Sequence, residues 1–127
     1  MDGTGGKPMP QSGLEYLQGL VKSGLTSGMA RTMKLRLVAV ADGNATIEGH
    51  PAAEHYNPQM RVHGGYCATL IDSAMGCAVQ STLAPGQGCT TLELKVNLVR
   101  AITEQTGEVR AEGTVVHRGR TTATSDA

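Results

Sequence analysis

Large aromatic side chains are almost missing from this 127-residue chain, which has no phenylalanine, no tryptophan and only three tyrosines. An apolar core must therefore be built from leucine, valine, isoleucine, methionine and alanine, most of which bury less surface than an aromatic ring. Such a core is thin for a monomer of one domain's length. Contact with further copies of the chain would bury more apolar surface, so the composition is a first indication of an oligomer.

Excess charge, basic clusters and long apolar runs are missing as well. The chain has 11 basic and 11 acidic residues and a formal net charge of zero. This balance gives no support to a nucleic-acid partner or a charged membrane surface. No apolar run reaches the ~18 residues that a membrane span needs, and the polar, Gly/Pro-rich start of the chain has no signal-peptide segment. We expect a soluble, cytoplasmic protein that binds neither nucleic acid nor membranes.

Cysteine is scarce and is not arranged as a ligand set. Cys67, Cys77 and Cys89 are an odd number, with no CxxC pair and no Cys/His spacing typical of a metal site. We interpret them as small buried hydrophobes in a reducing compartment. The sequence therefore predicts no metal and no bound cofactor.

Alternating and helical patterns indicate an α+β domain. Residues 1–12 are expected to form a flexible leader and residues 13–127 a single domain, which starts with a short amphipathic helix through Leu14, Leu17 and Val21. The patterns then predict strands over 33–41 and 45–49, a long helix from 64 to about 82, strands over 89–101 and 108–117, and a β-prone segment over 121–127. This order excludes a Rossmann-type domain and predicts one antiparallel sheet around one central helix.

The predicted central helix contains one isolated charge. Between Gly64 and Leu92, Asp72 is the only residue that is ionised at neutral pH. The apolar pattern predicts a helix buried nearly all round, and an unpaired carboxylate buried there would cost several kcal/mol. Such a group is paired, neutralised by a shifted pKa, or kept for chemistry. Because no basic residue lies nearby in the sequence, we favour chemistry over an ion pair or a hydrogen bond within the fold.

His63, Gly64 and Gly65 precede this helix. Free N–H groups at a helix N-terminus attract a developing negative charge, so the tripeptide could form an oxyanion hole, although the two glycines could equally serve a tight turn. His63 and Asp72 lie nine residues apart, which places them ~13 Å apart along one helix and on opposite sides of it. If both act on one substrate, they must come from two copies of the chain.

Further candidate residues flank the helix. Asn57 could orient a water or a carbonyl, or simply cap a turn. Thr90 and Thr91 could hydrogen-bond the acidic residue, or simply favour a strand. The run His117-Arg118-Gly119-Arg120 could contact phosphate groups, or be solvated surface.

The order and spacing of these residues resemble a known family. Asn57-(x)5-His63-Gly64-Gly65-(x)6-Asp72, followed by Thr90-Thr91 and His117-Arg118-Gly119-Arg120, is similar to the PaaI-type acyl-CoA thioesterases of the hotdog-fold superfamily. The resemblance covers residues 32–127. It implies a curved antiparallel sheet wrapped around the helix, a homodimer with two composite sites, and commonly a homotetramer. It also implies that the chain ends before its last strand, and that coenzyme A enters only as part of the substrate.

The resemblance also implies a role for each matched residue. Asp72 would be the general base or nucleophile, and the Gly64 amide would polarise the thioester carbonyl, with Gly65 beside it. His63 and Asn57 would support these two, and Thr91, or Thr90 in the neighbouring register, would place a hydroxyl next to the acid. Arg118, Gly119 and Arg120 would contact coenzyme A. Met60 stands where such proteins often have glycine.

The expected reaction is hydrolysis of a small or medium acyl-CoA, aliphatic or aromatic. Two other functions stay open. A hotdog dehydratase or hydratase would need a catalytic histidine, for which His63 is the placed candidate. A non-catalytic acyl-CoA-binding module would bind the same ligand without hydrolysis.

Overall fold

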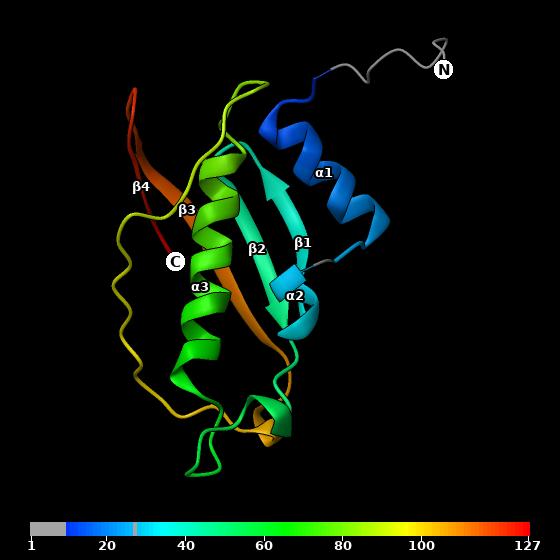
Figure 1. Cartoon of the computed structure of the whole chain (residues 1–127), viewed down its shortest axis with the longest axis vertical. Coiled ribbons are helices and arrows are strands. Elements are labelled where there is room, and N and C mark those ends of the chain that lie inside the picture. Colours follow the sequence, from blue (N-terminus) through cyan, green and yellow to red (C-terminus); the bar gives the residue numbers. More distant parts are fainter. Residues whose placement is uncertain (1–9, 27) are drawn as a thin grey trace.

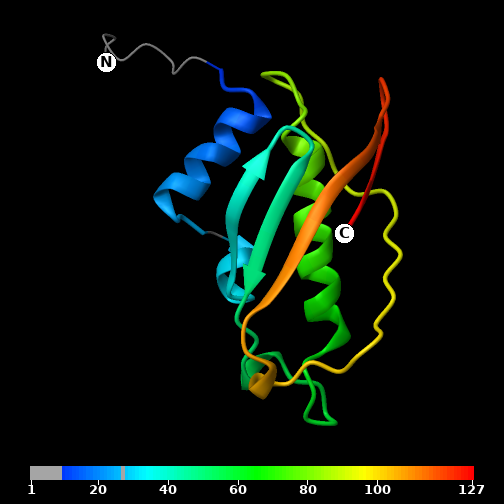
Figure 2. The same ribbon diagram turned by 180° about the vertical axis from the view of Figure 1, so that it is seen from behind.

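The computed structural model describes residues 10–26 and 28–127, so most of the predicted leader lies outside the described residues. One antiparallel sheet has the strand order β1-β2-β3-β4, and helix α3 lies across it (Figures 1 and 2). The elements are α1 (Gly13–Ser23), α2 (Gly28–Thr32), β1 (Leu35–Ala41), β2 (Asn44–Gly49), α3 (Gly64–Gln80), β3 (Val109–Arg118) and β4 (Ala123–Asp126). Within the described residues, no helix is long and apolar enough to cross a membrane.

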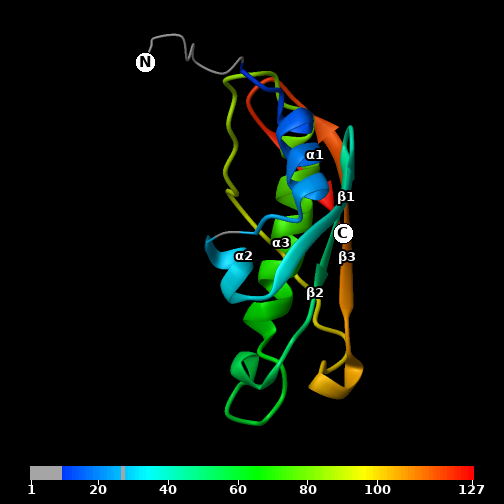
Figure 3. The same cartoon turned by 90° about the vertical axis from the view of Figure 1, so that its right-hand side faces the viewer.

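The predicted sheet and central helix are confirmed. β1 and β2 form the expected hairpin, and β2 pairs with β3 in continuous antiparallel register from Asn44↔Thr114 to Gly49↔Val109. The predicted amphipathic helix is α1, which packs beside β1 and buries Leu17 (Figure 3). The short helix α2, which follows it, was not predicted.

The predicted strand over 89–101 is wrong. This segment runs beside α3 as an extended chain, and no backbone hydrogen bond among the described residues involves it (Figure 1). Its supposed inward side is not covered either, because Leu92 is 83% exposed and Leu98 is 58% exposed. Sequence alternation shows that a segment could be a strand, but a strand also needs a neighbouring strand to pair with. Here β3 pairs only with β2 and, from Thr114 on, with β4.

Helix α3 is less enclosed than its composition suggested. Its buried face consists of Tyr66, Leu70, Ala74 and Ala78, spaced four residues apart. The first three pack on the sheet residues Leu35, Ile47 and Ala111. Burial raises the pKa of Tyr66 to about 12. In the single chain, the prediction of a helix buried nearly all round is therefore wrong: the positions of α3 between these buried residues, including Asp72, are half-exposed.

Gly113 on β3 allows α3 to approach the sheet closely. A Cβ atom at this position would lie 2.3 Å from the backbone oxygen of Ala74. Since helix backbone cannot move aside as a side chain can, we expect Gly113→Ala to lower the free energy of unfolding by about 2–3 kcal/mol, measured by urea denaturation. Gly19→Ala is the control, because no atom lies within 4 Å of a Cβ there. The control should be neutral or stabilising by up to about 1 kcal/mol, and equal losses in both variants would contradict the close-packing argument.

Candidate active site

The N-terminus of α3 leaves one amide free. The His63 ring caps the helix, since its Nδ1 accepts from the Gly65 N–H at 2.8 Å. The His63 N–H itself donates to the His55 carbonyl at 2.8 Å, which ties the helix start to the preceding loop. No acceptor for the Gly64 N–H occurs among the described residues. Of the two glycine amides, only that of Gly64 is therefore available to a ligand.

Asp72 lies two turns further along α3 and is held by a threonine. The Thr91 hydroxyl donates to Asp72 Oδ1 at 2.8 Å, so the structure brings Thr91, and not Thr90, to the acid. None of the ion pairs between described residues includes Asp72. With one oriented oxygen and no cationic partner, this half-exposed carboxylate is able to accept a proton or to attack a carbonyl carbon.

Gly64 and Asp72 do not meet within one chain. They are eight residues apart on one straight helix, which corresponds to about 12 Å along its axis. A catalytic base must reach the reacting group within hydrogen-bond distance, directly or through one water. Within a single chain, Gly64 and Asp72 therefore cannot act on the same reacting group.

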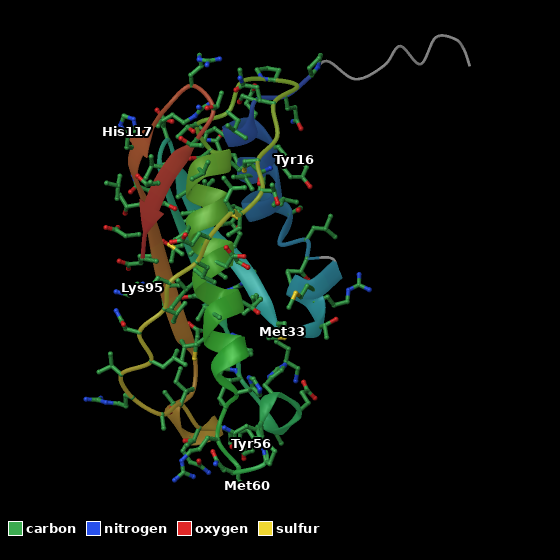
Figure 4. All side chains as sticks on the ribbon, turned by 60° about the vertical axis from the view of Figure 1, so that its left-hand side comes forward. Tyr16, Met33, Tyr56, Met60, Lys95 and His117 are labelled. Atoms are coloured by element: carbon green, nitrogen blue, oxygen red, sulfur yellow. The ribbon has the colours of Figure 1, made fainter. Side chains whose placement is uncertain are left out.

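Asn57 shapes the loop that leads to His63. Its Oδ1 accepts from the Gln59 N–H at 3.0 Å and from the Arg61 N–H at 3.1 Å. Between these two residues, Met60 has a φ of 61°, a left-handed conformation that favours glycine. This is the physical reason why glycine suits the position that Met60 occupies. Tyr56 and Met60 lie at the end of the molecule where α3 begins (Figure 4).

The predicted arginine group lies at the opposite end of the molecule, where Figure 4 labels His117. The Arg118 Nε donates to Thr82 Oγ1 at 3.2 Å, and the guanidinium also contacts the Gly119 carbonyl and Gln87. Gly119 closes a turn by donating its N–H to the Thr122 carbonyl at 2.8 Å. Arg120 is exposed. A single chain thus does not bring Arg118 or Arg120 to Gly64.

The cysteines are free thiols in different surroundings. Burial raises the pKa of Cys77 to about 11 and also raises the pKa of Cys67. Cys89 is exposed, so the interpretation of all three as buried is wrong for this one. The described residues contain no group of three His, Cys, Asp or Glu side chains placed to hold a metal ion.

Leu98 is a site neighbour that the sequence did not indicate. A Cβ atom on Gly64 would lie 2.7 Å from Leu98 Cδ1, so the leucine side chain sits directly against the start of α3. Leu98 also lines a cleft of about 620 Å³ between α3, the extended segment and β3. This contact joins residues 34 positions apart in the sequence, and no local pattern signals it.

Comparison with known proteins identifies the family. The sequence model of the thioesterase superfamily matches residues 60–127, which is more than half of the chain. The chain belongs to the thioesterase superfamily. A solved structure of a conserved protein from Pseudomonas aeruginosa is 33% identical to this thioesterase, with a TM-score of 0.70 and coverage of 78% of each chain. A comparison with curated proteins finds no match.

Other solved structures connect this thioesterase to the PaaI type. A mutant of the phenylacetic acid degradation protein PaaI from Thermus thermophilus is 26% identical, with a TM-score of 0.68 and coverage of 76% of this chain and 80% of that one. A phenylacetic acid degradation-related protein from Ralstonia eutropha is 23% identical, with a TM-score of 0.76 and coverage of 87% and 84%, and it shows the shared fold.

The comparisons confirm the resemblance inferred from the sequence. The chain is a PaaI-type thioesterase with the hotdog fold, an antiparallel sheet with a central helix, and in this structure the sheet is not closed. Its general activity is thioester hydrolysis. The matched region contains His63, Gly64, Asp72 and Thr91, whereas Asn57 lies before it.

Proposed function

We propose that this thioesterase hydrolyses a small or medium acyl-CoA in composite sites, each built from two copies of the chain. One copy supplies the free Gly64 amide, and the other supplies Asp72 with Thr91. The observation that carries the proposal is the arrangement on α3: an open oxyanion donor and an oriented carboxylate lie on the same helix, about 12 Å apart along its axis.

An antiparallel pair of α3 helices would bring the two halves together. A two-fold axis between the helices places the start of one beside the middle of the other. The half-exposed Asp72 would become enclosed at this interface.

In this site the Gly64 N–H binds the thioester carbonyl oxygen and stabilises the oxyanion that forms on it. Asp72 of the second copy accepts a proton from water, whose oxygen bonds to the carbonyl carbon. The carbon–sulfur bond then breaks, and the coenzyme A thiolate leaves and takes up a proton. In the alternative route the Asp72 carboxylate attacks the carbon directly, and water then hydrolyses the mixed anhydride. In both routes Thr91 holds one carboxylate oxygen, so the other faces the substrate.

The turn Arg118-Gly119-Arg120 would bind the phosphate groups of coenzyme A, because guanidinium groups match phosphate geometry. Arg120 is exposed, and Arg118 is ordered by its bonds to Thr82 and Gln87. A homotetramer formed as a dimer of dimers would cover further apolar surface, such as Leu92 and Val99, which are 83% and 92% exposed.

A subunit-mixing experiment tests the composite site. Asp72→Asn and Gly64→Pro chains, each inactive alone, are co-expressed with different affinity tags, and the heterodimer is purified by both tags. In the heterodimer one site carries both defects and the other carries neither. We expect acyl-CoA hydrolysis at about half the wild-type rate per dimer, because one of two equivalent sites is intact.

The wild-type chain is first assayed with acetyl-, hexanoyl-, decanoyl- and benzoyl-CoA by following thiol release. A purified heterodimer that is as inactive as its two parents would overturn the composite site. Absence of hydrolysis with every substrate in a dimeric wild-type protein would overturn acyl-CoA hydrolysis itself.

A further inference from the structure

The cleft beside Gly64 is an apolar space next to the proposed reaction centre. Its floor is α3, and its walls are the extended segment and β3. The apolar residues that line it include Cys67, Leu70, Ile71, Ile102 and Val109. Its volume of about 620 Å³ lies within the range of small-molecule sites, which is about 300–1,000 Å³.

The cleft begins one helical turn from Gly64. Cys67 follows Gly64 by three residues and Ile71 by seven, so all three share one face of α3. Leu98 borders both Gly64 and the cleft, since it touches the position of the glycine and is itself part of the lining. An acyl group whose carbonyl oxygen lies on the Gly64 amide and whose chain enters the cleft would therefore contact Leu98.

We infer that Leu98 is a specificity-determining residue of this thioesterase, and that the cleft takes the straight aliphatic chain of the acyl group. The inference rests on the proposed function, because it uses the Gly64 amide as the anchor of the carbonyl. The apolar part of the lining is aliphatic apart from Cys67, and none of the described residues that line the cleft has an aromatic ring on which an aromatic acyl group could stack. Its polar residues, Asn97, Arg100, Arg110 and Glu112, give it no buried charge for a polar acyl group to pair with.

The side chain of Leu98 can be changed without disturbing the core. It is 58% exposed and belongs to a segment without strand pairing. Leu98→Phe adds bulk at this position, whereas Leu98→Ala removes it. In an apolar pocket, one extra or missing methylene changes kcat/KM by about 10- to 200-fold.

The test is the ratio of kcat/KM for decanoyl-CoA to that for acetyl-CoA. We expect Leu98→Phe to lower this ratio by about tenfold or more, through a higher KM or lower kcat on decanoyl-CoA alone. Leu98→Ala should leave decanoyl-CoA a substrate and raise kcat/KM for the branched isovaleryl-CoA. Leu25→Phe is the control, because Leu25 is likewise an exposed leucine, at 60%, and is not part of the lining. Its ratio should equal that of the wild type.

The outcomes separate the inference from the proposed function. An unchanged ratio in Leu98→Phe, in a protein whose wild type hydrolyses acyl-CoA and depends on Asp72, would overturn the role of Leu98 only. An equal fall on acetyl- and decanoyl-CoA would also overturn it, because a merely structural change affects both substrates alike. Failure of the wild-type chain to hydrolyse any of them overturns the proposed function instead.

Discussion

Replacement of Asp72 by asparagine is expected to lower kcat by about 10²–10⁴-fold, which is the usual contribution of a general base. Asparagine has nearly the same shape, and its side-chain oxygen can still accept from the Thr91 hydroxyl, which lies 2.8 Å from Asp72 Oδ1 in the native chain. The amide can neither take a proton from water nor attack the carbonyl carbon. The measurements are single-turnover acyl-CoA hydrolysis and thermal unfolding, in which the melting temperature should change little.

The variant Thr91→Val tests how much the orientation of the Asp72 carboxylate contributes, apart from the carboxylate itself. It removes the hydroxyl that holds Asp72 but keeps the carboxylate, so we expect a smaller loss in kcat than that of Asp72→Asn. Near-wild-type turnover in a folded, dimeric Asp72→Asn protein would contradict the proposed role of the acid.

Replacement of Gly64 by proline is expected to lower kcat by about 10²–10³-fold, the typical loss when one oxyanion donor is removed. Proline has no backbone N–H, so the change deletes the one amide at this helix start that has no acceptor among the described residues. The fold should tolerate it, because proline is favoured at the first position of a helix. His63 also has φ −59° and ψ 138°, the extended conformation that a residue before proline adopts. Circular dichroism and kcat for acetyl-CoA check both expectations.

Gly64→Ala is the control for this prediction. It adds the same Cβ atom, which would lie 2.7 Å from Leu98 Cδ1, but it keeps the N–H. The far end of the Leu98 side chain can move, so the alanine variant should retain most of its turnover. Equal losses in the alanine and proline variants would assign the requirement for glycine to the contact with Leu98, and the double variant Gly64→Ala with Leu98→Ala would then recover activity.

Local sequence patterns correctly identified the helices and strands that form from the residues within them. The β1–β2 hairpin, α3 and β3 follow from alternation, a glycine turn and helical spacing, and their bounds agree with the prediction to within two residues at nearly every end. The segment over 89–101 has an equally regular alternation but is not a strand. The alternation concerns only the polarity of the side chains. A strand forms when its backbone hydrogen-bonds to a neighbouring strand, and that neighbour lies elsewhere in the sequence.

The sequence by itself determined the sheet-and-helix architecture, the lone charge of Asp72, the glycine entry to α3 and the spacing that separates them. These features depend on residue type and helical rise, which are local. Only the tertiary structure decided which amide is free, which threonine meets the acid, and that Leu98 lies against Gly64. Each of these depends on contacts between residues far apart in the chain, or on one side chain that caps its neighbour. The choice between two adjacent candidates, such as Thr90 and Thr91, is therefore made only when the segments pack against each other.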